Sequence, residues 1–311
     1  MRQVQLDPMT LKVRATGQSA VSCLVTCFCM AAFYPSITCL AIDYDNDSDY
    51  ENNSYNQWSQ AMTPQIPGYL VVFESTVRPF AAAAALGVIW TGAFRMEGPA
   101  PSRYMTAGAL SVALAGWLAI AQYVGSANMY FAGTDTAVPT LLLGLTIPLM
   151  IAAAGLWLSR AIASLVSAIP LRWLVAAQVF RIEGGIFLVL WADGRLPWQF
   201  ALPAGIGDLA TGVLAVVVAA RLARNAAGAR SAVYAWCLFG IADLVVAITM
   251  GAMTSPGRPH LLAFEAPNLL ITSYPLVMIP TFAVPLALML HGLVLWRLRR
   301  EPASNSRLAA A

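Results

Sequence analysis

Long apolar runs separated by short polar stretches make up most of this chain. A helix of about 20 apolar residues crosses the roughly 30 Å hydrocarbon core of a bilayer, and each run reaches that length. Residues 159–170 instead show the pattern of an amphipathic connector. The pattern predicts an all-α, polytopic transmembrane helix bundle of about eight spans over residues 21–42, 71–94, 104–123, 137–158, 171–191, 200–220, 231–253 and 270–298.

The first apolar run, residues 21–42, has two interpretations. A cleaved signal peptide has an apolar core of about 7–15 residues followed by a small-x-small exit site. This run is longer, and only Cys39-Leu-Ala41 resembles such an exit. We therefore predict an uncleaved anchor helix, whereas cleavage would leave seven spans.

Composition changes sharply near residue 66. Residues 1–66 are predicted to hold a cytoplasmic tail, the anchor helix and an acidic external loop, followed by the transmembrane bundle over residues 67–300 and a cytoplasmic tail over residues 301–311. The acidic loop begins like a calcium-binding loop, but Ser48 and Ser54 stand where that loop requires Gly and Glu. We therefore predict a solvated loop without a metal site.

The composition excludes a typical soluble protein. Hydrophobic residues make up 59% and charged residues 11% of the chain, against about 25% charged residues in soluble domains, and the mean hydropathy is +0.67. No polar stretch is long enough to bury a core of its own. Many alanines and a single lysine among the basic residues favour a bacterial protein, which we place in the inner membrane.

The basic residues predict the orientation of the bundle. With eight spans and a cytoplasmic N-terminus, the outer side holds Arg78, Arg195 and Arg258, and Arg181 lies within the membrane. The cytoplasmic segments hold the other 14 of the 18 Lys+Arg, namely Arg2, Lys12, Arg14, Arg95, Arg103, Arg160, Arg172, Arg221, Arg224, Arg230, Arg297, Arg299, Arg300 and Arg307. This asymmetry follows the positive-inside rule, so the net charge of +3 reflects orientation rather than nucleic-acid binding.

Four ionisable residues interrupt the central apolar runs: Arg181, Glu183, Asp208 and Asp243. A charge at the bilayer centre costs about 2.5–3.5 kcal/mol on insertion scales, so these residues are candidates for a function. At about 1.5 Å per residue, Arg181, Asp208 and Asp243 lie about 15, 12 and 18 Å from their helix ends. We predict that these three form one buried cluster. Gln178 shares the face of Arg181, and Glu183 points to the other side of the helix.

Carboxylates outnumber the basic side chain at this depth. Glu183, Asp208 and Asp243 face Arg181 alone, so at least one carboxylate lacks a basic partner, which suits a proton carrier. The alternative is a buried ion-pair network that holds the helices in register. The excess of carboxylates favours a substrate- or proton-binding site.

Proline and glycine lie near the charged positions. Pro203, Gly205 and Gly207 precede Asp208 and are expected to weaken that helix, and irregular backbone at membrane depth is tolerated where it lines a cavity. The last run holds three further prolines, which either free carbonyl groups or kink a packing helix. His291 lies near the inner end of this run and is either packed in the bundle or a proton relay.

Motifs for enzymatic chemistry are absent. No Walker A, HExxH, nucleophile-elbow or CxxC pattern occurs, and no lysine lies in an apolar run. Residues 205–210 match the letters of a dinucleotide fingerprint, but no strand precedes them. The five cysteines lie in apolar runs as small filler, and Glu74 and Arg78, spaced i,i+4, are predicted to form a structural pair. We predict no catalytic residue, no metal site and no cofactor.

Two segments resemble a pattern in uncharacterised bacterial multi-pass membrane proteins. They are Gln178-Val-Phe-Arg181 and Leu196-Pro-Trp-Gln-Phe-Ala-Leu-Pro-Ala-Gly-Ile-Gly-Asp208. The resemblance covers a small part of the chain. It implies membership of an uncharacterised membrane-protein family and transfers no activity.

The favoured function is that of a small secondary transporter or proton-coupled permease. Asp208 and Asp243 would carry protons or coordinate a cationic group, and Arg181 would hold an anionic substrate. The alternative is a non-catalytic membrane scaffold or assembly factor whose buried charges are structural. The expected partners are the lipid bilayer and a small-molecule or proton ligand, without nucleic acid, and the pattern identifies no protein partner.

Overall fold

A computed structural model of the protein describes residues 64–130, 140–256 and 260–300. The chain divides into two compact units, Met1–Ala61 and Met62–Ala311, and every described residue belongs to the second. The predicted anchor helix over residues 21–42 lies outside the described residues, as does the acidic stretch up to residue 63. Both stay predictions.

The backbone is helical and, within the described ranges, contains no β-strand. Five long α-helices in this part of the chain are α3 (Gly68–Arg95), α4 (Ala100–Ser126), α5 (Thr140–Leu158), α9 (Trp198–Ala223) and α10 (Ala229–Thr254). Two further spans are composite. The first consists of α7 (Leu171–Ala176), the 3-10 segment η1 (Ala177–Gly184) and α8 (Gly185–Ala192). The second consists of the π-helical turn η3 (Ile279–Ala283) and α11 (Val284–Arg300).

The described residues thus contain seven helical segments, and each is long and apolar enough to cross a membrane. A helix satisfies its own backbone hydrogen bonds, which is the condition for spanning a bilayer without water. The helical, apolar bundle therefore fits a multi-pass membrane protein.

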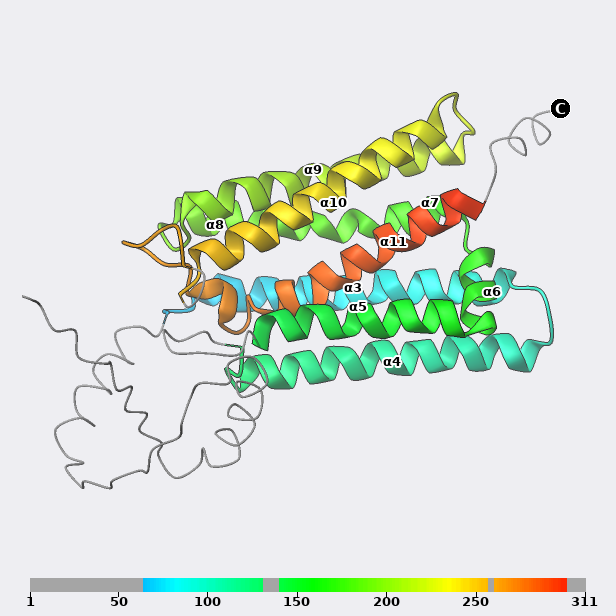
Figure 1. Ribbon diagram of the computed structural model, residues 1–311, viewed down its shortest axis with the longest axis horizontal. Coiled ribbons are helices and arrows are strands. Elements are labelled where there is room, and N and C mark those ends of the chain that lie inside the picture. The colour runs from blue at the N-terminus through cyan, green and yellow to red at the C-terminus, as the bar shows by residue number, and fades with distance from the viewer. Residues whose placement is uncertain (1–63, 131–139, 257–259, 301–311) are drawn as a thin grey trace, which may run out of the picture. The chain divides into compact units, whose positions relative to one another are not determined.

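The composite spans lie at the centre of the bundle. Buried residues make up 56% of the apolar window of Leu171–Ala192 and 61% of that of Ile279–Arg300, against 17% for α4 and 6% for α5. Segment η1 packs against α9 and α3, and α11 packs against α10, α5 and α7. Figure 1 shows α9 and α10 running side by side as an antiparallel pair. Side chains of the central spans therefore meet protein on most sides.

A short helix, α6 (Arg160–Ala168), connects α5 to the central span. The Oγ of Ser159 accepts a hydrogen bond of 3.3 Å from the backbone N–H of Ile162 and caps its first turn. Leu165 and Val166 are buried, and α6 packs against α3 and α4. This confirms the predicted amphipathic connector.

The last membrane helix begins later than predicted. Residues Leu270–Thr272 form a short 3-10 turn, and further turns follow until Ile279. A proline has no N–H to donate and its ring clashes with the preceding turn, so the helix begins where Pro280 occupies one of its first positions. The prediction of a helix over residues 270–298 is therefore wrong at its start.

Helix α9 runs unbroken through Pro203, Gly205 and Gly207, so the irregular backbone expected before Asp208 is not found in this helix. Pro203 lies inside α9, so the helix continues although one intrahelical hydrogen bond is lost there. The irregular backbone lies instead in the neighbouring span, where the 8 residues of η1 adopt 3-10 geometry. Runs of 3-10 helix longer than about 3–4 residues are uncommon and often mark a hinge or a strained segment.

Candidate functional site

Arg181 binds two carboxylates from two other helices. Its Nε donates a hydrogen bond of 2.7 Å to Oδ1 of Asp208, and its Nη2 lies 2.5 Å from the same oxygen. Nη2 also donates to Oδ2 of Asp243, and Nη1 donates to the carbonyl oxygen of Gly240 at 3.1 Å. Each nitrogen of the guanidinium therefore has a partner, and α9 and α10 are both tied to the central span.

The three charged side chains are almost completely buried. The exposed fraction is 2% for Arg181, 6% for Asp208 and 8% for Asp243. One guanidinium faces two carboxylates, so the group carries one excess negative charge when both are ionised. A proton or a bound cation would neutralise that charge.

The 3-10 geometry of η1 directs Arg181 into the bundle. Side chains at i and i+3 eclipse in a 3-10 helix, so Gln178, Arg181 and Gly184 lie on one face, and all three are buried. Gln178 Nε2 donates a hydrogen bond of 2.9 Å to the carbonyl oxygen of Ala287 on α11. The same face thus binds α9 and α10 through Arg181 and α11 through Gln178.

Two glycines provide the space that the side chains of Asp208 and Asp243 occupy. A Cβ atom on Gly207 would lie 1.7 Å from Oδ1 of Asp243, and one on Gly184 would lie 2.3 Å from Cβ of Asp208. Contacts below 3.0 Å force something to shift. The glycines before Asp208, interpreted above as helix-weakening residues, therefore serve close approach between helices.

His291 belongs to this cluster. Its Nε2 lies 3.3 Å from Nη1 of Arg181, and its ring packs at 4.8 Å between centroids against Trp236. A guanidinium only donates, so Nε2 accepts and the neutral imidazole carries its proton on Nδ1. Within the described part of the chain, Nδ1 has no hydrogen-bond partner.

Because the last helix begins at Ile279, His291 lies near its middle, and the predicted position near the inner end is wrong. Hereafter "the Arg181 cluster" means Arg181, Asp208, Asp243 and His291.

Glu183 lies on the same side as the Arg181 cluster. It lines, with Arg181 and Asp208, a cavity of about 10 Å³, whereas the sequence analysis placed it on the opposite side of the helix. In a 3-10 helix, two residues that are two positions apart point in directions about 120° apart around the helix axis. Glu183 can therefore reach the cavity beside Arg181. It also lies close enough to Glu74 for the two carboxylates to repel each other when ionised.

Glu74 forms the predicted pair with Arg78 at 3.8 Å. Glu74 is buried and Arg78 is half-buried, and Arg78 Nη1 also donates to the hydroxyl of Tyr274 at 3.4 Å. Among the residues the structure describes, Oε1 of Glu74 has no hydrogen-bond partner. The sequence analysis assigned Glu74 only a structural role, although a carboxylate in an apolar run is itself a signal of a site.

The link between α8 and α9 holds an exposed polar contact outside the spans. Arg195 Nε donates to Oδ2 of Asp193 at 2.5 Å, and the hydroxyl of Tyr69 donates to the same oxygen at 3.0 Å. Both hydrogen bonds hold the pKa of the Asp193 carboxyl below its usual range, and the bond from Arg195 has the larger effect. The contact joins the start of α3 to this link.

The structure thus joins the predicted residues Arg181, Asp208, Asp243 and His291 directly. Gln178 lies on the same face but bonds to backbone, and Glu183 lies at the adjoining cavity. No group of three or more His, Cys, Asp or Glu in the described ranges is arranged to hold a metal ion. The arrangement can hold and exchange a proton, or replace one carboxylate on Arg181 by another anion.

A family model for a domain of unknown function, DUF8737, matches residues 138–299, which is more than half of the chain. The chain belongs to the DUF8737 family. The family region contains the whole Arg181 cluster, and Glu74 and Arg78 lie before it. This agrees with the resemblance to an uncharacterised membrane-protein family. No curated protein and no solved structure matches the chain.

Proposed function

We propose that this DUF8737 protein is a small secondary transporter or proton-coupled permease, with the Arg181 cluster as its proton- or substrate-binding site. The observation that carries the proposal is that one buried guanidinium is shared by Asp208 and Asp243. Ionisable side chains at membrane depth mark substrate and proton pathways. Irregular backbone beside them, here η1, is also typical of transporter sites.

Proton binding changes the bonds within this cluster. A proton that adds to Oδ2 of Asp243 removes the charge of that carboxylate and weakens its bond to Nη2 of Arg181. One N–H of Nη2 is then free to bind an anionic group of a substrate, while Nη2 stays paired with Asp208. Loss of the proton restores the carboxylate, which competes with the substrate for Arg181, and proton and substrate are coupled in this way.

Transport also requires the helices around η1 to move. The cavity beside Arg181 measures about 10 Å³, whereas one water needs at least about 10–15 Å³. A substrate therefore enters only if α9 or α11 shifts relative to η1. The long 3-10 segment is the element we assign as the hinge, because its hydrogen bonds are weaker than those of an α-helix.

The proposed placement is the bacterial inner membrane, with both termini in the cytoplasm. The ends of α3, α9 and α11 that share one side of the bundle carry Arg95, Arg221 and Arg300. Positively charged helix ends favour the cytoplasmic side.

A second candidate is a non-catalytic membrane scaffold or assembly factor. It is supported by the complete pairing of the Arg181 guanidinium, which is also what a purely structural ion-pair network requires. In that case α9, α10 and η1 are fixed relative to one another, and a protein partner binds outside the cluster.

A thermal-shift screen of the purified full-length protein distinguishes the two functions. Small organic anions, organic cations and amino acids are added at two pH values to the wild type, to Asp208→Asn and to Asp193→Asn. A ligand that binds only the folded state raises its melting temperature. Asp193→Asn is the matched control, because the same change is made at an exposed carboxylate of the α8–α9 link.

A transporter is expected to give at least one ligand that stabilises the wild type and Asp193→Asn but not Asp208→Asn, while all three proteins fold. The scaffold is supported instead if no compound shifts the wild type and Asp208→Asn melts far below Asp193→Asn. That second result overturns the transport proposal.

A further inference from the structure

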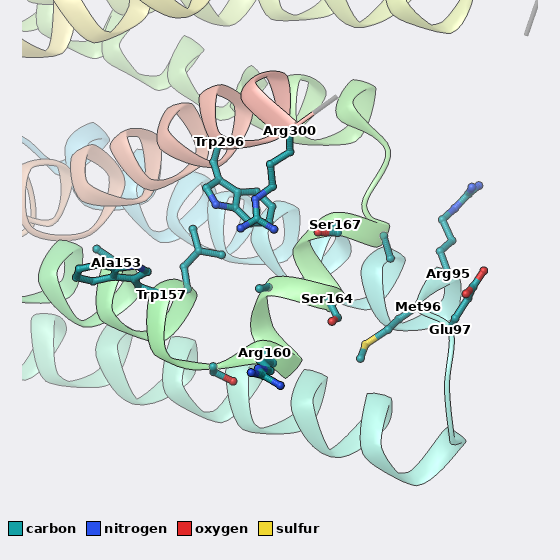
Figure 2. Close-up of a pocket in the computed structure, with 14 residues that line it drawn as sticks. Arg95, Met96, Glu97, Ala153, Trp157, Arg160, Ser164, Ser167, Trp296 and Arg300 are labelled. Carbon is teal, nitrogen blue, oxygen red and sulfur yellow. The ribbon is translucent and has the colours of Figure 1, made fainter. Parts of the chain in front are cut away.

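A large pocket opens at the end of the bundle where α3, α5 and α11 finish. Its volume is about 850 Å³. Figure 2 shows Arg300 and Trp296 from α11, Trp157 from α5, and Arg160 and Ser164 from α6 arranged around it. The pocket lies far along these helices from the Arg181 cluster and shares no lining residue with it.

The pocket is rich in positive charge. Arg95, Arg160 and Arg300 line it, together with one acidic residue, Glu97. Among the residues that the structure describes, none of these three arginines is paired with a carboxylate. The guanidinium of Arg300 lies 4.3 Å from the ring centre of Trp296, a cation–π contact that holds the side chain without neutralising its charge.

Hydroxyl groups and indole rings complete the lining. Ser164 and Ser167 lie on the exposed face of α6 and add two hydroxyl donors. Trp157 is 91% exposed and lines the pocket beside Leu156. Tryptophan is enriched where a membrane protein meets the lipid headgroups. The lining thus combines anion-binding groups with an apolar surface suited to the start of an acyl chain.

Helix α6 is held firmly as the floor of this pocket. Arg297, on α11, donates to the carbonyl oxygen of Val166 at 3.0 Å and to that of Ser167, and a basic side chain so placed satisfies the last carbonyls of a helix. On the opposite side, a Cβ on Gly92 of α3 would lie 2.9 Å from the carbonyl oxygen of Leu165. These contacts hold α6 in place along the pocket from two sides.

We propose that this pocket binds the headgroup phosphate of an anionic phospholipid. A guanidinium matches the geometry of a phosphate and donates two parallel hydrogen bonds to it. Basic pockets between transmembrane helices are suited to such headgroups. The excess of arginine over acid selects a lipid with net negative charge, and the apolar side formed by Trp157 and Leu156 selects a lipid over a free phosphate. This site is independent of the transport proposal.

Lipid binding by the full-length protein in detergent tests the assignment. Dioleoyl phosphatidylglycerol and dioleoyl phosphatidylcholine are titrated separately, and inorganic phosphate is added in competition with bound phosphatidylglycerol. Bound lipid is counted by native mass spectrometry. The test variant is Arg160→Gln/Arg300→Gln. The control is Arg224→Gln/Arg299→Gln, which removes the same charge from exposed positions at the same end of the bundle but outside the pocket.

Phosphatidylglycerol is expected to bind the wild type and the control, and to bind the test variant about 25-fold more weakly. This corresponds to about fivefold, or about 1 kcal/mol, for each arginine removed. Equal binding of phosphatidylcholine and phosphatidylglycerol overturns the proposal, as does unchanged binding by the test variant. If inorganic phosphate displaces the lipid at equal concentration, the site binds a free anion and the lipid assignment is wrong. Equal melting temperatures of the two variants verify that the test variant is folded.

Discussion

Asp243 occupies the space that a side chain at position 207 would need. A Cβ on Gly207 would lie 1.7 Å from Oδ1 of Asp243, while the other oxygen of that carboxylate accepts from Arg181. The contact between α9 and α10 and the charge cluster are therefore one structural feature. Enlarging residue 207 displaces the carboxylate from its partner.

Gly207→Ala is expected to destabilise the protein by about 1–3 kcal/mol, the usual range for overpacking a filled core. Unfolding in mixed micelles with increasing SDS measures the loss. Gly116→Ala is the control, because a Cβ there meets nothing within 4 Å, and its effect should stay within about 1 kcal/mol. Equal losses in the two variants would contradict the close approach.

Removing Arg181 should cost more than removing the whole set of charges. Arg181→Gln leaves two buried carboxylates without a basic partner and is expected to lower the free energy of unfolding by about 3–5 kcal/mol. The triple variant Arg181→Gln/Asp208→Asn/Asp243→Asn should recover part of that loss. The same micelle titration measures both, and a triple variant less stable than Arg181→Gln would contradict the ion-pair geometry.

His291 should be a neutral imidazole with its proton on Nδ1, because its Nε2 accepts from a guanidinium. Nitrogen NMR of protein labelled at histidine distinguishes the two ring nitrogens near neutral pH. His260 is the other of the 2 histidines, and the variant His260→Gln removes its signals. A spectrum with both nitrogens of His291 protonated would contradict the contact with Arg181.

The contact at the α8–α9 link predicts a small pH dependence. Because the pKa of Asp193 is held down in the folded state, its contribution to stability is present above the unfolded pKa of about 3.9 and is lost as pH falls through the folded pKa. The melting temperature of the wild type minus that of Asp193→Asn should therefore shrink between about pH 6 and pH 3. Arg195→Gln should reduce this dependence, because it removes the first of the two hydrogen-bond donors that lower the pKa of Asp193 while Tyr69 remains. A difference that grows on acidification would have the wrong sign.

Arg297 should control the order of α6. Arg297→Gln removes the donor to the carbonyl oxygens of Val166 and Ser167, so amide hydrogen exchange should become faster over residues 163–169. Arg299→Gln, at an exposed position two residues along α11, is the control and should leave α6 unchanged. Equal exchange in both variants would show that α6 is held by its apolar packing alone.

The sequence by itself predicted the seven helices in the described residues that are long and apolar enough to cross a membrane. A lipid-embedded helix must satisfy its own backbone and present about 20 apolar residues, and these are local properties that any single run displays. The amphipathic pattern of α6 is local in the same sense. The number of residues from each helix end also predicted that Arg181, Asp208 and Asp243 lie at one depth, because the rise per residue of a helix is fixed.

Only the tertiary structure decided where helical geometry departs from that fixed rise. The last helix begins only at Ile279, and His291 on this helix lies beside Arg181. The 3-10 register of η1 turned Glu183 toward the cavity of Arg181. From the sequence alone, Gly207 is interpreted as a helix-weakening residue. In the structure it allows α9 to approach Asp243 closely. In each case the deciding interaction joins residues far apart in sequence, and local propensity is overruled by packing.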